Sequence, residues 1–553
     1  MNSYENWQDF YPRPMLKRQS FFNLNGEWFL DNTSIDIPFP PQSTLSHYNK
    51  EVNDHLTYIK EFQLPQDFVP ENHRILLHFG AIDQIARVYI NNQYLGEHIG
   101  GYLPFSFDIT DFLKDAVNQL RVDVTDTLSH VYPYGKQRKK RGGMWYTPVS
   151  GIWQTVWIEA VPQQAIQSIK ITPSLSGIHI HIDSDATQYH ISIPLNDYIF
   201  EKTYSSQDID IDLSKETDTL HLWTPKNPYL YSITIKTETD CIESYFALRT
   251  IEIKNQQICL NNQPIFLHGV LDQGYFDDGI FLPEKPQGFV DDILKMKELG
   301  FNFLRKHIKI EPEVFYYACD KYGMLIMQDM VNNGNYNWFL DTALPNKGVL
   351  YRPDRFPGQK QRKQVFEKHM LETLDHLYNH PCIISYTIFN EGWGQFDADR
   401  MYKICKSYDP TRFYDATSGW FHQKESDVDS LHVYFCTKEL STKMEKPLFL
   451  SECGGYTRPI QDHLFKKDAH YGYGQTDSEE ALTNRIIDLY EEMVLSSIPN
   501  GLCGCVYTQL SDVEDEINGL YTYDRQVCKV DKKRMQDISN KIFDCFKKNQ
   551  KKL

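Results

Sequence analysis

The pattern of hydrophobic and polar positions divides the chain into three regions. Up to about residue 160, short strand-like runs such as Arg74–Phe79 and Ala86–Ile90 are separated by turn signals, and helical periodicity is nearly absent. This first region predicts a β-sandwich. From residue 163 to about 250 the alternation continues, as in Ile178–Ile182, where every second residue is isoleucine. The second region has the length of a small immunoglobulin-like sandwich.

After Ile251 the pattern changes to strand-like runs that alternate with amphipathic segments of helical length. Such alternation predicts a parallel sheet covered by helices. We expect strands near residues 265–270, 301–305, 324–329, 382–390, 412–416, 430–434, 447–452 and 503–509. We expect helices near residues 287–299, 311–322, 361–379, 396–407, 478–496 and 531–547. Eight strands in a region of this length match one (β/α)₈ barrel.

Two of the expected barrel strands end in a glutamate. The apolar run Ile383–Phe389 is followed by Asn390 and Glu391, and Leu448–Ser451 is followed by Glu452, with glycines shortly after each. A carboxylate at the end of a buried strand is costly unless it is paired or takes part in chemistry. In a (β/α)₈ barrel the carboxyl ends of the strands form the catalytic face. Two glutamates there suggest the acid/base and nucleophile of glycoside hydrolysis. The alternative for either glutamate is a structural ion pair or a surface position.

The bulk composition argues against several partners and indicates a compartment. The chain has 553 residues, too many for one core, and a net charge of −17, which argues against nucleic acid or an anionic membrane as the main partner. We find no apolar leader before Pro14 and no apolar run long enough to span a membrane. The 11 cysteines are odd in number and all lie from Cys241 onward, which favours a reduced, cytoplasmic protein.

Three local segments have a composition that could indicate a site. Cys503-Gly504-Cys505 has no second pair at zinc-site spacing, so we interpret it as two thiols on one face of a strand. The basic run Lys136–Arg141 is interpreted as a solvated loop rather than a binding patch. The segment Met330–Lys360 exceeds normal loop length and is a candidate wall of a substrate pocket. The alternative for this last segment is an insertion without a role at the site.

Several motifs carry a resemblance to a known family. They are Tyr11–Pro14, Leu24–Trp28, Gly100–Phe105, Gly151–Trp157, Leu222–Tyr231 and Phe246–Arg249. In this order and spacing the chain resembles glycoside hydrolase family 2, the family of β-galactosidases, β-glucuronidases and β-mannosidases, over nearly its full length. The resemblance implies an N-terminal jelly-roll β-sandwich at residues 1–162, an immunoglobulin-like β-sandwich at 163–251 and a catalytic (β/α)₈ TIM barrel at 252–553.

The resemblance also implies roles for particular residues. Glu391 would be the acid/base and Glu452 the nucleophile, an order that the physics of the sequence does not assign by itself. The residues expected to bind the substrate or to neighbour the nucleophile are Asn390, Arg305, His432, Tyr434, Trp393 and Trp420. For the two tryptophans and His432 the alternative is packing in the core. No metal ion and no cofactor is expected.

The chain departs from the family pattern at several positions. His307 comes one place earlier than the usual histidine after strand two, and Asp329 stands where a glutamate is usual. The Asn-x-Lys that reads the uronate carboxylate in glucuronidases would fall at Glu516-Ile517-Asn518, and a glutamate there would repel a carboxylate. His268–Gln273 lacks the multiple histidines of the large galactosidases, which weakens the case for lactose.

These observations predict an O-glycosyl hydrolase, a retaining exo-β-glycosidase whose partner is a carbohydrate. A β-galactoside is the first expectation for its substrate, with β-mannoside and β-glucuronide specificities behind it. Two alternatives use the same residues: a carbohydrate-binding protein that has lost activity, and a transglycosidase. We expect no nucleic acid or membrane partner, and the sandwich edges would allow a homo-oligomer.

Overall fold

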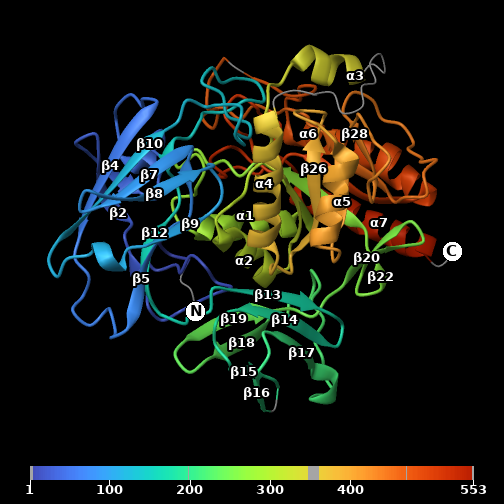
Figure 1. Cartoon of the computed structure of the whole chain (residues 1–553). Helices are drawn as coiled ribbons and strands as arrows, with labels where there is room; N and C mark the ends of the chain where they lie inside the picture. Colours follow the sequence, from blue (N-terminus) through green and yellow to red (C-terminus); the bar gives the residue numbers. More distant parts are fainter. Residues whose placement is uncertain (1–3, 197, 347–359, 469, 551–553) are drawn as a thin grey trace.

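A computed structural model describes residues 4–196, 198–346, 360–468 and 470–550 of the chain. It shows two β-sandwiches set against the flank and the base of a barrel (Figure 1). The first sandwich is blue, the second is green, and the barrel runs from green through yellow to red. The expected order of a jelly-roll sandwich, an immunoglobulin-like sandwich and a C-terminal (β/α)₈ barrel is confirmed.

The first sandwich packs a four-stranded sheet against a six-stranded sheet, both antiparallel. The smaller sheet has the order β1 (Phe22–Asn23), β12 (Val156–Pro162), β5 (His73–Phe79) and β9 (Phe105–Asp108). The larger has the order β3 (Thr33–Ile37), β2 (Gly26–Leu30), β4 (His55–Phe62), β10 (Asn118–Thr125), β7 (Ile85–Ile90) and β8 (Gln93–Ile99). A small pair joins β6 (Ile82–Asp83) to β11 (Gly151–Ile152). Alternate residues of β10 are buried, so its period of two fills the core between the sheets.

The second sandwich packs three strands against four. One sheet has the order β13 (Ser168–Pro173), β14 (Gly177–Asp183) and β17 (Asp208–Asp212), and the other β16 (Ile199–Tyr204), β15 (Tyr189–Pro194), β18 (Tyr231–Lys236) and β19 (Cys241–Phe246). The isoleucines of β14 are buried while His179 and His181 are exposed, as the alternation predicts. A ribbon of β20 (Ile251–Lys254), β21 (Gln257–Leu260) and β22 (Gln263–Pro264) leads into the barrel.

The barrel is one parallel sheet of eight strands. In chain order they are β23 (Leu267–Asp272), β24 (Phe303–Lys306), β25 (Leu325–Asp329), β26 (Ile383–Asn390), β27 (Phe413–Ser418), β28 (Asp429–Val433), β29 (Leu448–Gly454) and β30 (Leu502–Thr508). Neighbours in sequence are neighbours in the sheet, and β30 pairs with β23. The two edges, β27 and β28, lie against each other, so the barrel is nearly closed. Every strand begins and ends within two residues of its expected bounds.

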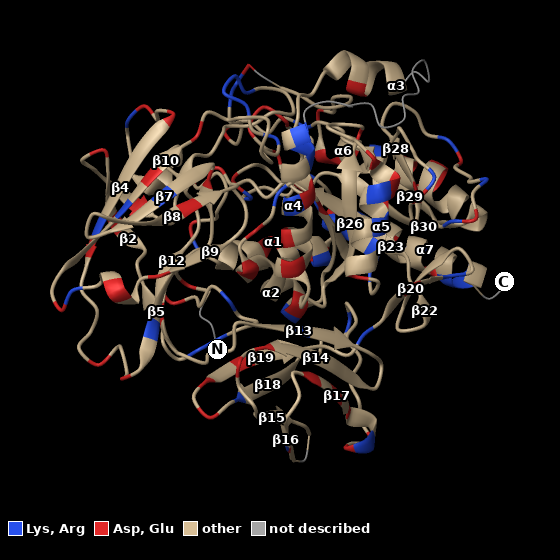
Figure 2. Cartoon of the chain, viewed as in Figure 1, with Lys and Arg blue, Asp and Glu red and all other residues tan. Residues whose placement is uncertain are grey.

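Helices cover the outside of this sheet, and each expected helix is found. They are α1 (Gln287–Glu298), α2 (Glu313–Tyr322), α4 (Lys360–Leu377), α5 (Ala398–Tyr408), α6 (Glu479–Leu489), which continues into the π-helical turn Tyr490–Leu495, and α7 (Lys532–Gln550). Among the described residues, no helix is both long and apolar enough to cross a bilayer. Acidic and basic residues are interspersed along the ribbon of all three domains (Figure 2).

A loop of the first sandwich reaches across to the barrel and bears on the site. We call residues 130–147 the sandwich loop. The Tyr134 amide donates to the Asn332 carbonyl at 3.1 Å, and the Tyr134 hydroxyl donates to the Gly334 carbonyl at 2.8 Å. At its other end the Thr147 amide donates to Glu514 at 2.8 Å. The loop is therefore fixed to the segments that follow β25 and β30.

The basic run lies within this loop, and the structure corrects its interpretation. Lys139 and Lys140 are exposed, as expected of a solvated loop. Arg138, however, stacks 3.9 Å from the Trp145 ring centroid, and Arg141 pairs with Glu514 at 3.2 Å. Lys136 faces the mouth of the barrel. A one-dimensional run of charge could not reveal that its members point in different directions.

Candidate active site

The two strand-end glutamates are brought to the same mouth of the barrel. Glu391 directly follows β26, in which every residue is buried, and its backbone has a φ of +53°. This left-handed conformation costs a non-glycine residue of the order of 1 kcal/mol and turns the chain sharply at the strand end. Glu452 lies within β29, across the barrel mouth, and is 4% exposed.

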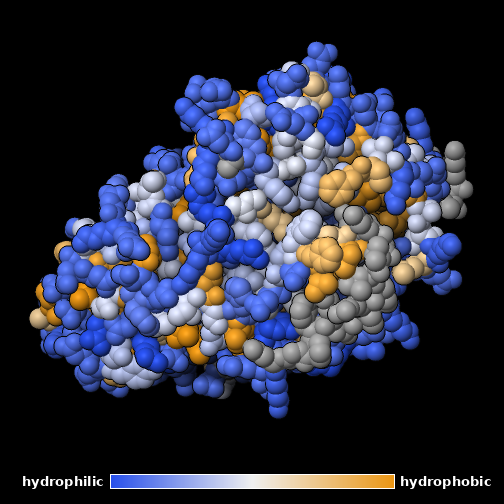
Figure 3. Space-filling model, turned by 90° about the horizontal axis from the view of Figure 1, so that it is seen from above, coloured by the Kyte–Doolittle hydropathy of each residue, from blue (hydrophilic) through white to orange (hydrophobic). Residues whose placement is uncertain are grey.

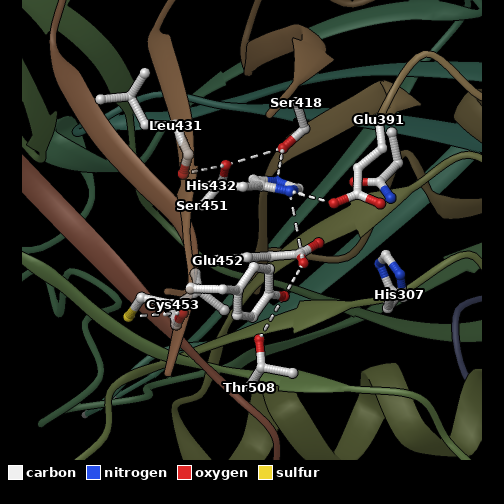
Figure 4. A network of polar contacts seen from close by, with 12 residues as sticks. His307, Glu391, Ser418, Leu431, His432, Ser451, Glu452, Cys453 and Thr508 are labelled. Carbon is white, nitrogen blue, oxygen red and sulfur yellow. Dashed lines mark hydrogen bonds and ion pairs between the residues drawn. The ribbon is translucent and has the colours of Figure 1, made fainter. Parts of the chain in front are cut away.

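The carboxylates point toward each other with a histidine between them (Figure 4). Single ligand atoms of Glu391, Glu452 and His432 all lie within 4.8 Å of one another. His432 Nδ1 is 2.8 Å from Glu391 Oε1 and 3.6 Å from Glu452 Oε2. Retaining glycosidases hold their carboxyl groups about 5–5.5 Å apart, and inverting enzymes about 6.5–9.5 Å apart. An oxygen separation of at most 4.8 Å is nearer to the first of these spacings than to the second.

Glu452 is surrounded by groups that stabilise its charge. Arg305 Nη1 donates to its Oε1 at 3.0 Å, and the Tyr434 hydroxyl donates to its Oε2. Burial raises the pKa of Glu452, but the neighbouring His432 and Arg305 outweigh that effect and bring the pKa down to about 2. The Tyr434 hydroxyl acts in the same direction. Glu452 is therefore ionised at neutral pH and held in one orientation.

Arg305 connects this carboxylate to the neighbouring strand ends. It is fully buried, its Nε donates to Asp329 at 3.0 Å, and its Nη2 donates to the Asn390 side-chain oxygen at 2.8 Å. His307 Nδ1 lies 2.7 Å from Asp329, and burial holds the pKa of His307 well below its usual value. Asp329 thus orients the side chains of both Arg305 and His307. Although His307 comes one place earlier in the sequence than the family pattern has it, its imidazole lies at the barrel mouth.

Glu391 has different surroundings. Its side chain is 15% exposed, and His432 is its only hydrogen-bond partner among the described side chains. The second nitrogen of His432 lies 3.0 Å from the Ser418 hydroxyl, which fixes the ring between β27 and the two carboxylates (Figure 4). Glu452 is therefore held by Arg305 and Tyr434 beneath the surface, whereas Glu391 faces the opening.

A cavity of about 770 Å³ opens above these carboxylates. From the sequence-predicted residues it is lined by Asn390, Glu391, Trp420, Tyr434 and Glu452. In the view from the side of α3 (Leu344–Asn346), apolar surface gathers near the middle of the barrel face (Figure 3). The volume of the cavity is that of a pocket for a small molecule such as one or two sugar rings.

Three predicted residues lie behind the wall of this cavity rather than on it. Arg305 and His432 are buried beneath the carboxylates and bind them instead of facing the opening. Trp393 is 3% exposed, donates to the Gly334 carbonyl at 2.9 Å and packs edge-on against Trp145, which is the packing alternative for this residue. Trp420 does face the cavity and donates to the Asp341 carbonyl at 2.7 Å.

Several residues that line the cavity belong to no predicted motif: Met144, Phe435, Cys436, Tyr471, Tyr473 and Thr508. The basic run contributes Lys136, and the segment His268–Gln273 contributes Leu271 and Gln273, although neither segment was expected to line a pocket. The segment Met330–Lys360, the expected wall, contributes Phe339, Thr342 and Ala343. Trp338 also lines the cavity, as expected of a wall built by the segment from Met330, although residues 347–359 of that segment lie outside the described part. Glu516, placed by the resemblance where glucuronidases read a carboxylate, is a further lining residue.

The same carboxylate pair is also the place where a metal ion could bind. Within the described ranges, Glu391, His432 and Glu452 form the one group of three or more His, Cys, Asp or Glu side chains close enough to share an ion. Cys503 and Cys505 are both buried in β30, with their side chains on one face of the strand, and they are not part of such a group.

Comparisons with known proteins agree with this architecture. Residues 22–162 match the sugar binding domain of glycosyl hydrolases family 2, residues 164–249 match a second domain of that family, and residues 251–495 match its TIM barrel domain. The chain is 24% identical over 467 residues to a β-galactosidase of Thermoanaerobacter pseudethanolicus and 26% identical over 405 residues to a β-glucuronidase of Streptococcus agalactiae. These matches cover 78% and 66% of this chain but only 58% and 64% of those relatives.

Solved structures share the fold at low identity. A β-D-glucuronidase of Dictyoglomus thermophilum superposes with a TM-score of 0.75 at 19% identity, covering 96% of this chain and 98% of the other. A galacturonate-bound β-galacturonidase of Eisenbergiella tayi gives 0.70 at 18% identity, covering 95% and 98%. The three domain matches lie in unbroken order along the chain and together cover most of it, so the chain belongs to glycoside hydrolase family 2.

Proposed function

We propose that this chain is an exo-acting β-glycosidase that hydrolyses terminal β-linked sugars with retention, with a β-galactoside as its first candidate substrate. The observation that carries the proposal is the pair of carboxylates whose oxygens lie within 4.8 Å of each other in unlike surroundings. Glu452, with its pKa lowered to about 2, suits the nucleophile, because it is ionised and oriented. Glu391, at the opening, suits the acid/base.

The proposed reaction has two displacements. In the first, a Glu452 oxygen attacks the anomeric carbon while the Glu391 carboxylic acid gives its proton to the departing glycosidic oxygen. The charge of Glu452 is lost in the resulting glycosyl ester. In the second, Glu391, now ionised, takes a proton from water as that water attacks the anomeric carbon, and Glu452 leaves as a carboxylate. Each step inverts the anomeric carbon, so the net outcome is retention.

Other residues would support these steps without joining them. Asn390 accepts from Arg305 through its oxygen, so its amide nitrogen is left to donate to a sugar hydroxyl beside the anomeric carbon. Trp420 offers a ring face at the same opening. The named relatives include β-galactosidases and β-glucuronidases, so the family alone leaves the sugar open.

The sharpest test removes each carboxylate and supplies azide as a replacement. With Glu452→Gly, azide would displace an activated aryl leaving group once, so we expect rescued turnover and an α-glycosyl azide. With Glu391→Gly, the glycosyl ester still forms from an activated substrate and azide opens it, so we expect a β-glycosyl azide. Each variant should lose about 10⁴-fold or more of kcat without azide, the scale on which nucleophile removal acts. Glu445→Ala, at an exposed position before β29, is the control.

Three outcomes would count against the proposal. Unchanged turnover in both glycine variants would remove the two glutamates from the chemistry. A β-glycosyl azide from Glu452→Gly and an α-glycosyl azide from Glu391→Gly would make Glu391 the nucleophile and Glu452 the acid/base. Sugar binding without turnover by the parent protein, on a panel of nitrophenyl β-glycosides, would instead support the silent binding protein.

A further inference from the structure

One side of the cavity carries a set of polar groups that the proposed chemistry does not use. Lys136 comes from the sandwich loop, Gln273 follows β23, and Glu516 follows β30. These three side chains converge from two domains and from neighbouring strands of the barrel. We call them the polar wall.

Lys136 is a half-buried cation that lacks a direct partner. Its ammonium makes no hydrogen bond or ion pair with any residue in the described ranges, while its backbone carbonyl accepts from the Tyr146 amide at 3.0 Å. The charge of Lys136 acts to lower the pKa of both His307 and Glu516. Its neighbours Arg138 and Arg141, in contrast, are both engaged, on Trp145 and on Glu514. A lysine held at a pocket by a fixed loop, with its three donors unused, is available for a ligand.

Glu516 is a buried carboxylate with accepting capacity to spare. It is 4% exposed, and it accepts from the Tyr146 hydroxyl and, at 3.0 Å, from Asn518 Nδ2. A carboxylate can accept about four hydrogen bonds, so two are already made within the protein. The Tyr471 amide donates to the Asp515 carbonyl at 2.7 Å, which holds the Glu516 loop against the loop of Tyr471 and Tyr473.

Gln273 supplies a second, independent observation that points to a ligand. It is 4% exposed and lines the cavity, and neither its oxygen nor its nitrogen has a hydrogen-bond partner among the described residues. A buried amide left unsatisfied on both atoms is unfavourable, so natural structures rarely keep one without a partner of some kind. Vicinal hydroxyls, each able to donate and accept, would satisfy it.

We propose that Lys136, Gln273 and Glu516 form the specificity site for the glycone, and that this site selects a neutral sugar over the corresponding uronate; the inference rests on the proposed glycosidase function. A hydroxyl placed between Lys136 and Glu516 accepts from the ammonium and donates to the carboxylate at the same time. A uronate carboxylate could accept from Lys136 but would meet the Glu516 carboxylate with like charge. The N-terminal sandwich thereby contributes directly to substrate choice.

Matched substrates that differ only at C6 test this inference. We would compare nitrophenyl β-galactoside with β-galacturonide, and β-glucoside with β-glucuronide. The parent protein should show a kcat/KM at least about 100-fold higher for the neutral member of whichever pair it accepts, because a site built for a hydroxyl rejects groups that leave it mispaired.

The variants separate the two charges. Glu516→Gln keeps the shape and removes the repulsion, so it should narrow the neutral-to-uronide ratio by about 10-fold or more. Lys136→Met removes the donor and should lower kcat/KM on the neutral sugar by about 10-fold, mainly through KM. Lys140→Met, on the exposed part of the sandwich loop, and Glu445→Gln, at an exposed position before β29, are the matched controls and should leave the ratio unchanged.

A preference of the parent protein for uronides, or an unchanged ratio in folded Glu516→Gln, would overturn the inference while leaving the glycosidase proposal intact. If no glycoside is hydrolysed, the proposed function fails instead. Calorimetric titration with galactose, glucose, galacturonate and glucuronate then still decides the inference, since tighter binding of a uronate than of its neutral partner would overturn it.

Discussion

The floor and the rim of the cavity are built in different ways. The floor consists of side chains at strand ends: Asn390, Glu391, Tyr434, Glu452 and Thr508. They are tied to one another and to the buried Arg305 and His432 by hydrogen bonds. The floor is thus a preorganised network in which removing one member disturbs the rest.

The rim consists of loop residues whose side chains make no hydrogen bond to the floor among the described residues. One side is the polar wall, Lys136, Gln273 and Glu516. The other side is aromatic, with Trp338 58%, Phe339 57% and Phe435 69% exposed, on the segments that follow β25 and β28. The difference indicates that floor residues would set the rate for every substrate, whereas rim residues would set which substrate is accepted.

After the two glutamates themselves, the largest effect is expected at Arg305, which binds the floor from beneath. Arg305→Gln leaves Asp329 and Glu452 without their buried cation, which should lower kcat/KM by about 100- to 1,000-fold, on the scale of a lost electrostatic stabiliser. Breaking a buried ion pair also costs about 3–5 kcal/mol of unfolding free energy. The readouts are the pH profile of kcat/KM and a denaturant titration.

The pH profile of kcat/KM should shift in one direction when Arg305 is replaced. Glu452 must be ionised to attack, and Arg305 helps to lower its pKa to about 2, so loss of the cation raises that pKa and moves the acid limb of kcat/KM to higher pH. Arg412→Gln is the control, because Arg412 is equally buried and pairs with Asp409 away from the cavity. Equal acid limbs in the two variants would show that Arg305 acts only on stability.

A smaller effect is expected from Tyr434→Phe. The change removes one charge-assisted hydrogen bond to Glu452 and leaves the ring in place, which should lower kcat by about 10- to 100-fold. The acid limb should move upward here too, by less than in the Arg305 variant. Tyr386→Phe is matched, since the Tyr386 hydroxyl is buried in the same barrel without a hydrogen-bond partner among the described residues. An equal loss of kcat in Tyr434→Phe and Tyr386→Phe would show that the hydrogen bond from Tyr434 to Glu452 has no specific role in the reaction.

Most of the floor was predictable from the sequence because its residues stand at the ends of recognisable strands, although Thr508 was not predicted. Continuous apolar runs located the strands, and the glutamates at the ends of two of them, Glu391 and Glu452, had to lie at one mouth of the barrel. The rim follows from no such rule. Lys136 sits in a run that is otherwise partly solvated, and its approach to Glu516 depends on how a sandwich docks on a barrel. Likewise, nothing in the sequence distinguishes Trp393, packed in the core, from Trp420, which faces the cavity.

The smallest effect is expected from the aromatic side of the rim. An exposed indole such as Trp338 can stack on the leaving group, so Trp338→Ala should raise KM for an aryl glycoside by about 2- to 10-fold, equivalent to roughly 0.5–1.5 kcal/mol. The kcat of a methyl glycoside should change little, because that leaving group has no ring to stack. Phe29→Ala, an equally exposed aromatic position on the first sandwich, is the control. If Trp338→Ala slowed both substrates equally through kcat, Trp338 would belong with the floor, and the division of labour between floor and rim would not hold on that side.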